Sequence, residues 1–218
     1  MLLEYPLSSS EIAAARLWQS EIAAFQNHSL PPNPVLFTGS SSIGLWNSLA
    51  EDFPDFPVIN RGFGGSQLSD SVYHFERLVV PVTPRAVVLY AGDNDIAFEK
   101  PSARVAENFQ AFVQLMQTHL PDTPLFFISI KPSPSRWFLR NEIRRANSTI
   151  EAICRAEELL HFVNIEPCLL DESGVPRAGF YVEDDLHLSA GGYDAWKGVL
   201  RPLLARIADA NASASIIN

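Results

Sequence analysis

The chain has 218 residues, of which 47% are hydrophobic, and this is enough for one globular domain with a sizeable core. The formal net charge of −9 argues against nucleic acid as a partner, because phosphate binding needs clustered Lys and Arg. An acidic surface also disfavours adhesion to anionic membranes, and no apolar run is long enough for stable membrane insertion.

The cysteines and the N-terminus bear on redox chemistry and location. Cys154 and Cys168 are the only cysteines, so neither a disulfide framework nor the spacing of a metal site is predicted. The pattern around Cys154 is amphipathic, which predicts a buried thiol there. The N-terminal segment has no basic region and carries Glu4 within its short apolar stretch, so it is a poor secretion signal. We therefore expect a cytoplasmic protein.

Short apolar segments alternate with amphipathic ones along the chain. The short segments are rich in β-branched and aromatic residues and predict strands, whereas apolar residues spaced three and four apart predict helices. No repeat or linker divides the chain, so we expect one domain over 1–218 with its core at about 33–208. In chain order we expect a helix over 11–27, a strand over 35–38, a short helix after the serines at 40–42, a strand over 57–60, an amphipathic segment over 68–80, a strand over 86–90, a helix over 102–120, a strand over 125–130, a helical face over 139–153, a strand over 162–165, a last helix over 193–207 and a frayed tail after 209.

This order of elements predicts an α/β fold. Strands that alternate with helices and are apolar on both faces form a parallel sheet that helices cover on each side. In open sheets of this kind, ligands bind beyond the carboxyl ends of the strands. The polar turns that follow the first four predicted strands are therefore expected on one rim of the sheet, where they can form a site.

The stretch VLFTGSSSIGL at 35–45 holds the first of these turns. Ser40, Ser41 and Ser42 stand where a strand leads into a helix N-terminus. Free backbone N–H groups and the positive end of the helix dipole favour an oxyanion at such a place, so it suits a nucleophile. Serine is also a preferred N-cap residue, and this stretch taken alone favours capping.

A nucleophilic serine needs a base and a group that orients the base. His187 is the candidate base, because Asp184 lies three residues before it in DDLH and a turn of that length brings carboxylate and imidazole together. Asp185 is the weaker candidate for the carboxylate that orients His187. Taken alone, DDLH is equally well explained as an acidic flank that the dipole of the last helix favours. The other histidines lack an Asp at this spacing and are interpreted as structural or surface residues: His28, His74, His119 and His161.

Candidate oxyanion donors follow other strands. Asn94 offers a side-chain N–H in the AGDND turn, Gly65 a backbone N–H in the RGFGGSQ turn, and Ser41 its own backbone N–H. Both turns are also explained as ordinary turn and loop sequences. The KPSPSRW loop is predicted to form one wall of a substrate pocket, although Pro-rich loops are often only spacers; its candidate pocket residues are Lys131, Arg136 and Trp137.

These motifs together resemble the SGNH (GDSL-type) hydrolase superfamily of esterases and lipases. Each motif alone is weak, but their order along the chain and their placement after predicted strands and before the last helix are specific. The chain departs from the family pattern at Ser40, where an Asp is common. The matching motifs are GSS at 39–41, a glycine turn ending at Gly65, G-x-N-D at 92–95 and D-x-x-H at 184–187.

The resemblance implies both a fold and a mechanism. The implied fold is a flavodoxin-like three-layer α/β/α sandwich with a five-stranded parallel sheet. The implied reaction is hydrolysis of a small-molecule carboxylic ester through an acyl-enzyme, without a metal or organic cofactor. Carried over residue by residue, the pattern makes Ser41 the nucleophile, Asp184 and His187 the rest of the triad, and Ser41, Gly65 and Asn94 the oxyanion donors.

The alternative hypothesis is a non-catalytic flavodoxin-like module that holds the phosphate of a flavin or nucleotide at the serine turn. It explains the serine turn equally well but gives Asn94, Asp184 and His187 no role. RGFGGSQ is not the spaced dinucleotide fingerprint, so a nicotinamide-dependent enzyme ranks lower. The G-x-S-x-G elbow of the α/β-hydrolase fold is absent around Ser41. A family member that has lost its activity is a further alternative, which the intact set of motif residues disfavours.

Overall fold

A parallel five-stranded sheet forms the centre of the protein in a computed structural model, which describes residues 6–26 and 29–214. All strand pairs are parallel and the strand order is β2-β1-β3-β4-β5. This confirms the predicted α/β class and the five-stranded parallel sheet. The strands are β1 (Val35–Gly39), β2 (Val58–Gly62), β3 (Ala86–Tyr90), β4 (Leu125–Ile128) and β5 (Leu160–Val163).

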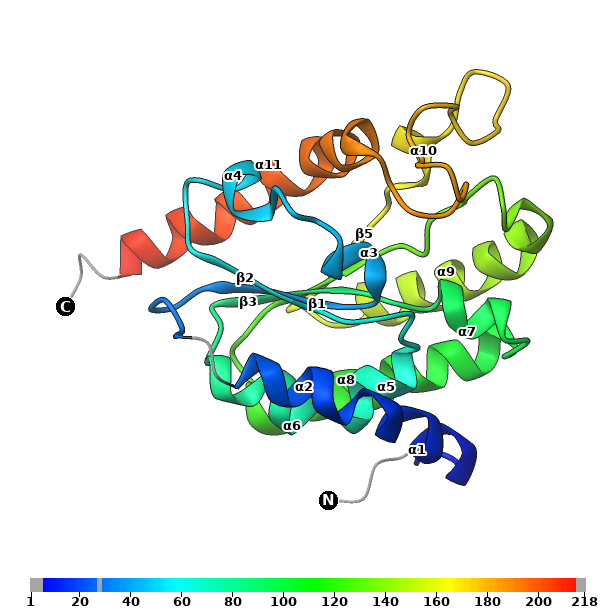
Figure 1. The fold of residues 1–218 in the computed structure, drawn as a ribbon. Coiled ribbons are helices and arrows are strands. Elements are labelled where there is room, and N and C mark those ends of the chain that lie inside the picture. Colours follow the sequence, from blue (N-terminus) through cyan, green and yellow to red (C-terminus); the bar gives the residue numbers. More distant parts are fainter. Residues whose placement is uncertain (1–5, 27–28, 215–218) are drawn as a thin grey trace.

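Helices cover the two faces of the sheet, which gives three layers (Figure 1). One face carries α3 (Ser41–Gly44), α4 (Leu49–Asp52) and the long α11 (Ala190–Ala214), with α10 (Glu166–Leu169) beside them. The other face carries α1 (Ser9–Ala15), α2 (Gln19–Phe25), α5 (Leu68–Tyr73), α6 (Phe75–Leu78), α7 (Asp93–Ala97), α8 (Ser102–His119) and α9 (Arg140–Arg155); short 3₁₀ helices are η1 (Arg16–Trp18), η2 (Val80–Val82) and η3 (Trp137–Leu139).

Two hydrophobic cores lie on opposite sides of the sheet because alternate residues of each strand point to opposite faces. Val35 and Phe37 of β1 belong to the core beneath α11, whereas Leu36 belongs to the core beneath α8 and α9. Every residue of β1 and β3 is buried. The central strands β1 and β3 are almost entirely apolar for this reason, and the polar residues of the site follow where these two strands end.

Aromatic side chains fasten α11 to the serine turn. The Trp46 ring stacks on Tyr193 with ring centroids 5.0 Å apart, and its edge meets Trp196 at 6.0 Å. The Tyr193 hydroxyl donates a hydrogen bond of 2.9 Å to the carbonyl of Ser42. Because α11 follows directly after His187 in the chain, this packing brings the end of the protein onto the turn after β1.

The structure differs from the sequence prediction at several element boundaries. The first helix is interrupted by η1, and the segment 68–80 is broken at His74, whose Nε2 bonds to the Ala15 carbonyl at 2.8 Å. Strand β4 ends at Ile128 because Ile130 pairs through its N–H and C=O with the Asn147 side chain instead of β5. Helix α11 continues to Ala214, past the start of the predicted frayed tail, and 215–218 lie outside the described residues.

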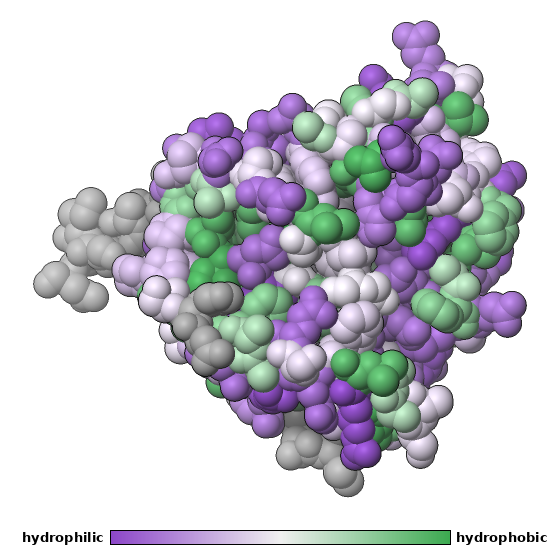
Figure 2. Space-filling model, in the orientation of Figure 1, coloured by the Kyte–Doolittle hydropathy of each residue, from purple (hydrophilic) through white to green (hydrophobic). Residues whose placement is uncertain are grey.

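The surface mixes polar and apolar residues. In Figure 2 hydrophobic residues occur in small separate groups among hydrophilic ones, as expected when most large apolar side chains are in the core. Within residues 6–26 and 29–214, no helix has both the length and the apolar character that a membrane crossing needs.

Candidate active site

The site lies at the carboxyl ends of β1 and β3, next to the point where the strand order reverses. At the end of β1, Gly39 has a φ of +118°, and a Cβ on it would lie 1.9 Å from the Tyr90 carbonyl oxygen. Only glycine fits there, so the chain can leave the sheet tightly. The N–H of Ser40 then donates to the same Tyr90 carbonyl at 2.8 Å.

The structure distinguishes the three serines. Ser40 and Ser42 are each 1% exposed, and Ser41 alone of the three is half-buried with its Oγ 2.9 Å from His187 Nε2. Ser40 occupies the N-cap position of α3, but its side chain makes no capping hydrogen bond. The capping interpretation of this turn therefore does not hold for Ser40, and only Ser41 is placed to react with a ligand at the rim.

Asp184 orients the His187 ring. Its Oδ2 lies 2.5 Å from His187 Nδ1, and its Oδ1 accepts the backbone N–H groups of Leu186 and His187, each at 2.9 Å. Burial raises the pKa of Asp184, but these hydrogen bonds outweigh it and bring the pKa down to about 2. The ionised carboxylate therefore accepts a hydrogen bond from the N–H at Nδ1, and this leaves Nε2 as the acceptor for the Ser41 hydroxyl.

The neighbouring Asp185 has a structural role that differs from that of Asp184. Its backbone has a φ of +55°, and its carbonyl accepts hydrogen bonds from the N–H and Oγ–H of Ser135. Asp184, and not Asp185, contacts the imidazole. The spacing of three residues in DDLH was the signal that identified this pair.

Asn94 and Gly65 are neighbours at the same rim. Asn94 is 6% exposed, and its Nδ2 donates to the Ser66 carbonyl at 3.0 Å. A Cβ on Gly65 would lie 3.9 Å from this Nδ2. Ser66 Oγ in turn donates to the Gly39 carbonyl at 3.3 Å, so the glycine turn joins Asn94 to the end of β1. Ser41 opens α3, and its N–H is one of those without a partner inside the helix.

The pocket prediction needs a correction. Lys131 is 1% exposed, and its ammonium lies 3.0 Å from Asp93 and 3.2 Å from the Tyr90 hydroxyl. Lys131 therefore does not line a pocket wall. A buried ammonium requires an ionic partner, and here that partner is Asp93. Arg136 contacts Asn94 directly, with Nη2 2.9 Å from Oδ1. The pocket role of Trp137, which is half-buried, stays a prediction.

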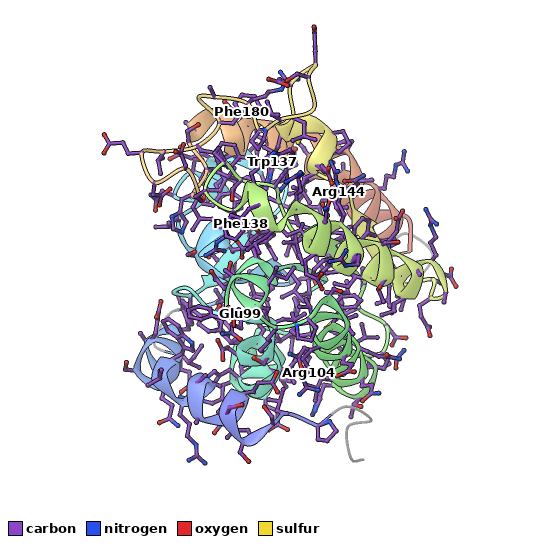
Figure 3. The ribbon with its side chains drawn as sticks, turned by 90° about the vertical axis from the view of Figure 1, so that its right-hand side faces the viewer. Glu99, Arg104, Trp137, Phe138, Arg144 and Phe180 are labelled. Atoms are coloured by element: carbon purple, nitrogen blue, oxygen red, sulfur yellow. The ribbon has the colours of Figure 1, made fainter. Side chains whose placement is uncertain are left out.

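The KPSPSRW loop contacts the site at two places, because Arg136 bonds to Asn94 and Ser135 bonds to the carbonyl of Asp185. In the view of Figure 3, Trp137 and Phe138 lie between Phe180, which is in the loop from α10 to α11, and Glu99, which follows α7. Two contacts were missed by the sequence analysis: Arg136 of this loop with Asn94, and, at the start of α5, the Leu68 N–H with Asp95 Oδ2 at 2.9 Å. Both join residues that are far apart in the chain, and no spacing pattern in the sequence marks them.

The other described histidines and both cysteines lie away from this site; the histidines are His74, His119 and His161. Burial lowers the pKa of His74 and of His161, and His119 packs beside Phe75, as expected of structural residues. His28 lies outside the described residues. Cys154 is buried as predicted, and burial raises its pKa to about 12.

The fold and the Ser–His–Asp arrangement define the class: a flavodoxin-like three-layer protein with the SGNH hydrolase fold. The chain belongs to the GDSL-like Lipase/Acylhydrolase family, whose model matches residues 34–195. The resemblance read from the four motifs is thereby confirmed.

Curated and solved relatives agree with this placement. The chain is 25% identical over 206 residues to the platelet-activating factor acetylhydrolase IB subunit alpha2 of Homo sapiens, which covers 86% of this chain and 83% of the relative. A GDSL-like lipase from Bacteroides thetaiotaomicron has a TM-score of 0.73 at 22% identity, covering 89% of this chain and 98% of the other. An acetylxylan esterase from Geobacillus stearothermophilus has a TM-score of 0.65 at 13% identity, covering 82% and 95%. The two structural likenesses show the fold.

Proposed function

We propose that this protein is a serine hydrolase that cleaves carboxylic esters through an acyl-enzyme. The observation that carries the proposal is the hydrogen-bonded chain from Ser41 Oγ to His187 and on to Asp184, at 2.9 and 2.5 Å. Nucleophile, base and orienting carboxylate are the three groups that acyl transfer needs. A phosphate-binding module would leave this chain of contacts without a function.

In the proposed mechanism each residue has a defined role. His187 Nε2 takes the hydroxyl proton as Ser41 Oγ attacks the ester carbonyl, and the carbonyl oxygen becomes an oxyanion. The N–H groups of Ser41, Gly65 and Asn94 donate hydrogen bonds to this oxyanion and stabilise it. His187 then returns the proton to the leaving alcohol, and the acyl group stays on Ser41. Water attacks this acyl-enzyme with His187 again as base, which releases the carboxylic acid and restores the serine.

Two of the three relatives named above point to an acetyl group as the acyl group. One is called an acetylhydrolase and the other an acetylxylan esterase. We therefore propose an acetyl ester of a small molecule as the substrate class.

The test is hydrolysis of nitrophenyl esters from acetyl to long acyl chains by the wild type and Ser41→Ala. We expect the highest kcat/KM for acetyl, and a fall of about 10⁴-fold or more in kcat for Ser41→Ala. Ser42→Ala is the matched control, because its hydroxyl is buried beside the reacting one. A Ser41→Ala enzyme with nearly normal turnover would overturn the proposal, and a preference for long acyl chains would overturn the acetyl class alone.

A further inference from the structure

Asn94 can serve as an oxyanion donor in only one orientation of its side-chain amide. Its Oδ1 and Nδ2 have nearly the same shape, and a flip of the amide would turn an acceptor toward the oxyanion. Two independent contacts fix the orientation. Nδ2 donates to the Ser66 carbonyl, which can only accept, and Oδ1 accepts from Arg136, which can only donate. The second N–H of Nδ2 is then left for a ligand on the side of Gly65.

Arg136 is itself held in place by a buried group of charges. Its Nη1 lies 3.1 Å from Asp93 Oδ2, and the same oxygen lies 3.0 Å from Lys131 Nζ. Burial alone would raise the pKa of Asp93, but the positive charges of Lys131 and Arg136 outweigh burial. The pKa of Asp93 therefore lies below its ordinary value, and the carboxylate stays ionised. Lys131 and Arg136 thus share the single negative charge of Asp93, and the three side chains together keep one net positive charge. The side chains are 16% exposed or less, so water screens this charge poorly.

The backbone around Arg136 is anchored without help from the guanidinium. Ser135 donates through both its N–H and its Oγ–H to the Asp185 carbonyl, at 3.1 and 2.9 Å. The Tyr181 hydroxyl donates to the Pro132 carbonyl at 2.7 Å. Removal of the Arg136 side chain therefore leaves the loop tied to the segment that carries Asp184 and His187.

We propose that Arg136 is a positioning residue of the oxyanion hole, acting through Asn94. Its guanidinium holds the amide with the donor side toward the substrate, and it polarises the amide so that the free N–H becomes a stronger donor as charge develops. This deepens the proposed ester hydrolysis and rests on it.

A double-mutant cycle on nitrophenyl acetate hydrolysis tests the proposal. We expect Arg136→Met to lower kcat about 10- to 100-fold with little change in KM, because the interaction matters mainly in the transition state. In the Asn94→Ala background, the same substitution should cost less than about threefold, since the group it acts through is gone. Arg136→Lys keeps the charge without the planar fork and should lose less activity than Arg136→Met.

Arg140→Met is the matched control. Arg140 lies four residues further on, over the Trp137 ring with 5.3 Å to its centroid, and should tolerate the change with kcat unaltered. An equal loss from Arg136→Met in both backgrounds would overturn the proposal, as would a rise in KM alone. If Arg136→Met fails to fold, the cycle is run with Arg136→Lys, whose loss in kcat should be smaller but should still disappear in the Asn94→Ala background; an equal loss in both backgrounds would overturn the proposal. An additive cycle with inactive Ser41→Ala refutes only this inference, whereas active Ser41→Ala refutes the proposed function as well.

Discussion

Substitution of Asp184 by Asn tests whether the carboxylate sets the tautomer of His187. Asp184 Oδ1 accepts two backbone N–H groups, and Oδ2 faces Nδ1 of the ring. In Asp184→Asn, the amide oxygen has to keep the two backbone donors, so the NH₂ group turns to Nδ1. Nδ1 must then accept, and Nε2 must carry the proton and point it at Ser41. The ring can no longer take the serine proton.

The expected loss is large while the fold is preserved. A wrong tautomer in an otherwise intact triad costs about 10³- to 10⁴-fold in kcat. The melting temperature should change little, because both backbone hydrogen bonds remain. The assay is kcat on nitrophenyl acetate, with Asp185→Asn as control, since Asn tolerates the left-handed backbone at that position. If Asp184→Asn kept more than about a tenth of wild-type kcat, the tautomer reasoning would be refuted.

Three further substitutions have defined outcomes. Asn94→Ala should lower kcat about 10²- to 10³-fold, measured on the same ester. Burial raises the pKa of Glu11, but hydrogen bonds from Arg104 and its neighbours bring it well below 4.5. Its contribution to stability is therefore present above about pH 4.5 and lost as the pH falls. Glu11→Gln should cost about 2 kcal/mol by urea unfolding at pH 7 and progressively less at lower pH; a pH-independent difference would contradict this. In Cys168→Ser, the remaining thiol of Cys154 should react with Ellman's reagent at pH 8 only after unfolding.

Local patterns in the sequence predicted the sheet and the two segments that carry the candidate triad, the turn with Ser41 and the DDLH turn with Asp184 and His187. The strand over 86–90 matches β3 because a short, wholly apolar run bounded by turn residues is typical of a buried strand at the centre of a parallel sheet. Asp184 and His187 were paired correctly because a turn of three residues fixes their distance. The turn after β1 was placed correctly because Gly39 marks where the chain leaves the sheet.

Local patterns of this kind could not predict contacts between residues that are far apart in the chain. Lys131 was expected at a pocket wall, but its partner Asp93 lies 38 positions earlier in the chain, and only the folded sheet brings the two together. The same holds for Arg136 and Asn94, which are 42 positions apart. The end of β4 depended on the Asn147 side chain of α9, which takes both backbone groups of Ile130.

Covalent labelling of the serine turn tests the central claim most directly. The protein is treated with a fluorophosphonate, which reacts with an activated serine, and the adduct is located by mass spectrometry of the peptides. We predict one adduct per chain, on Ser41, which is lost in Ser41→Ala and greatly slowed in His187→Ala. An adduct on Ser40 or Ser42, or a wild-type protein that stays unlabelled, would contradict the assignment of Ser41 as the nucleophile.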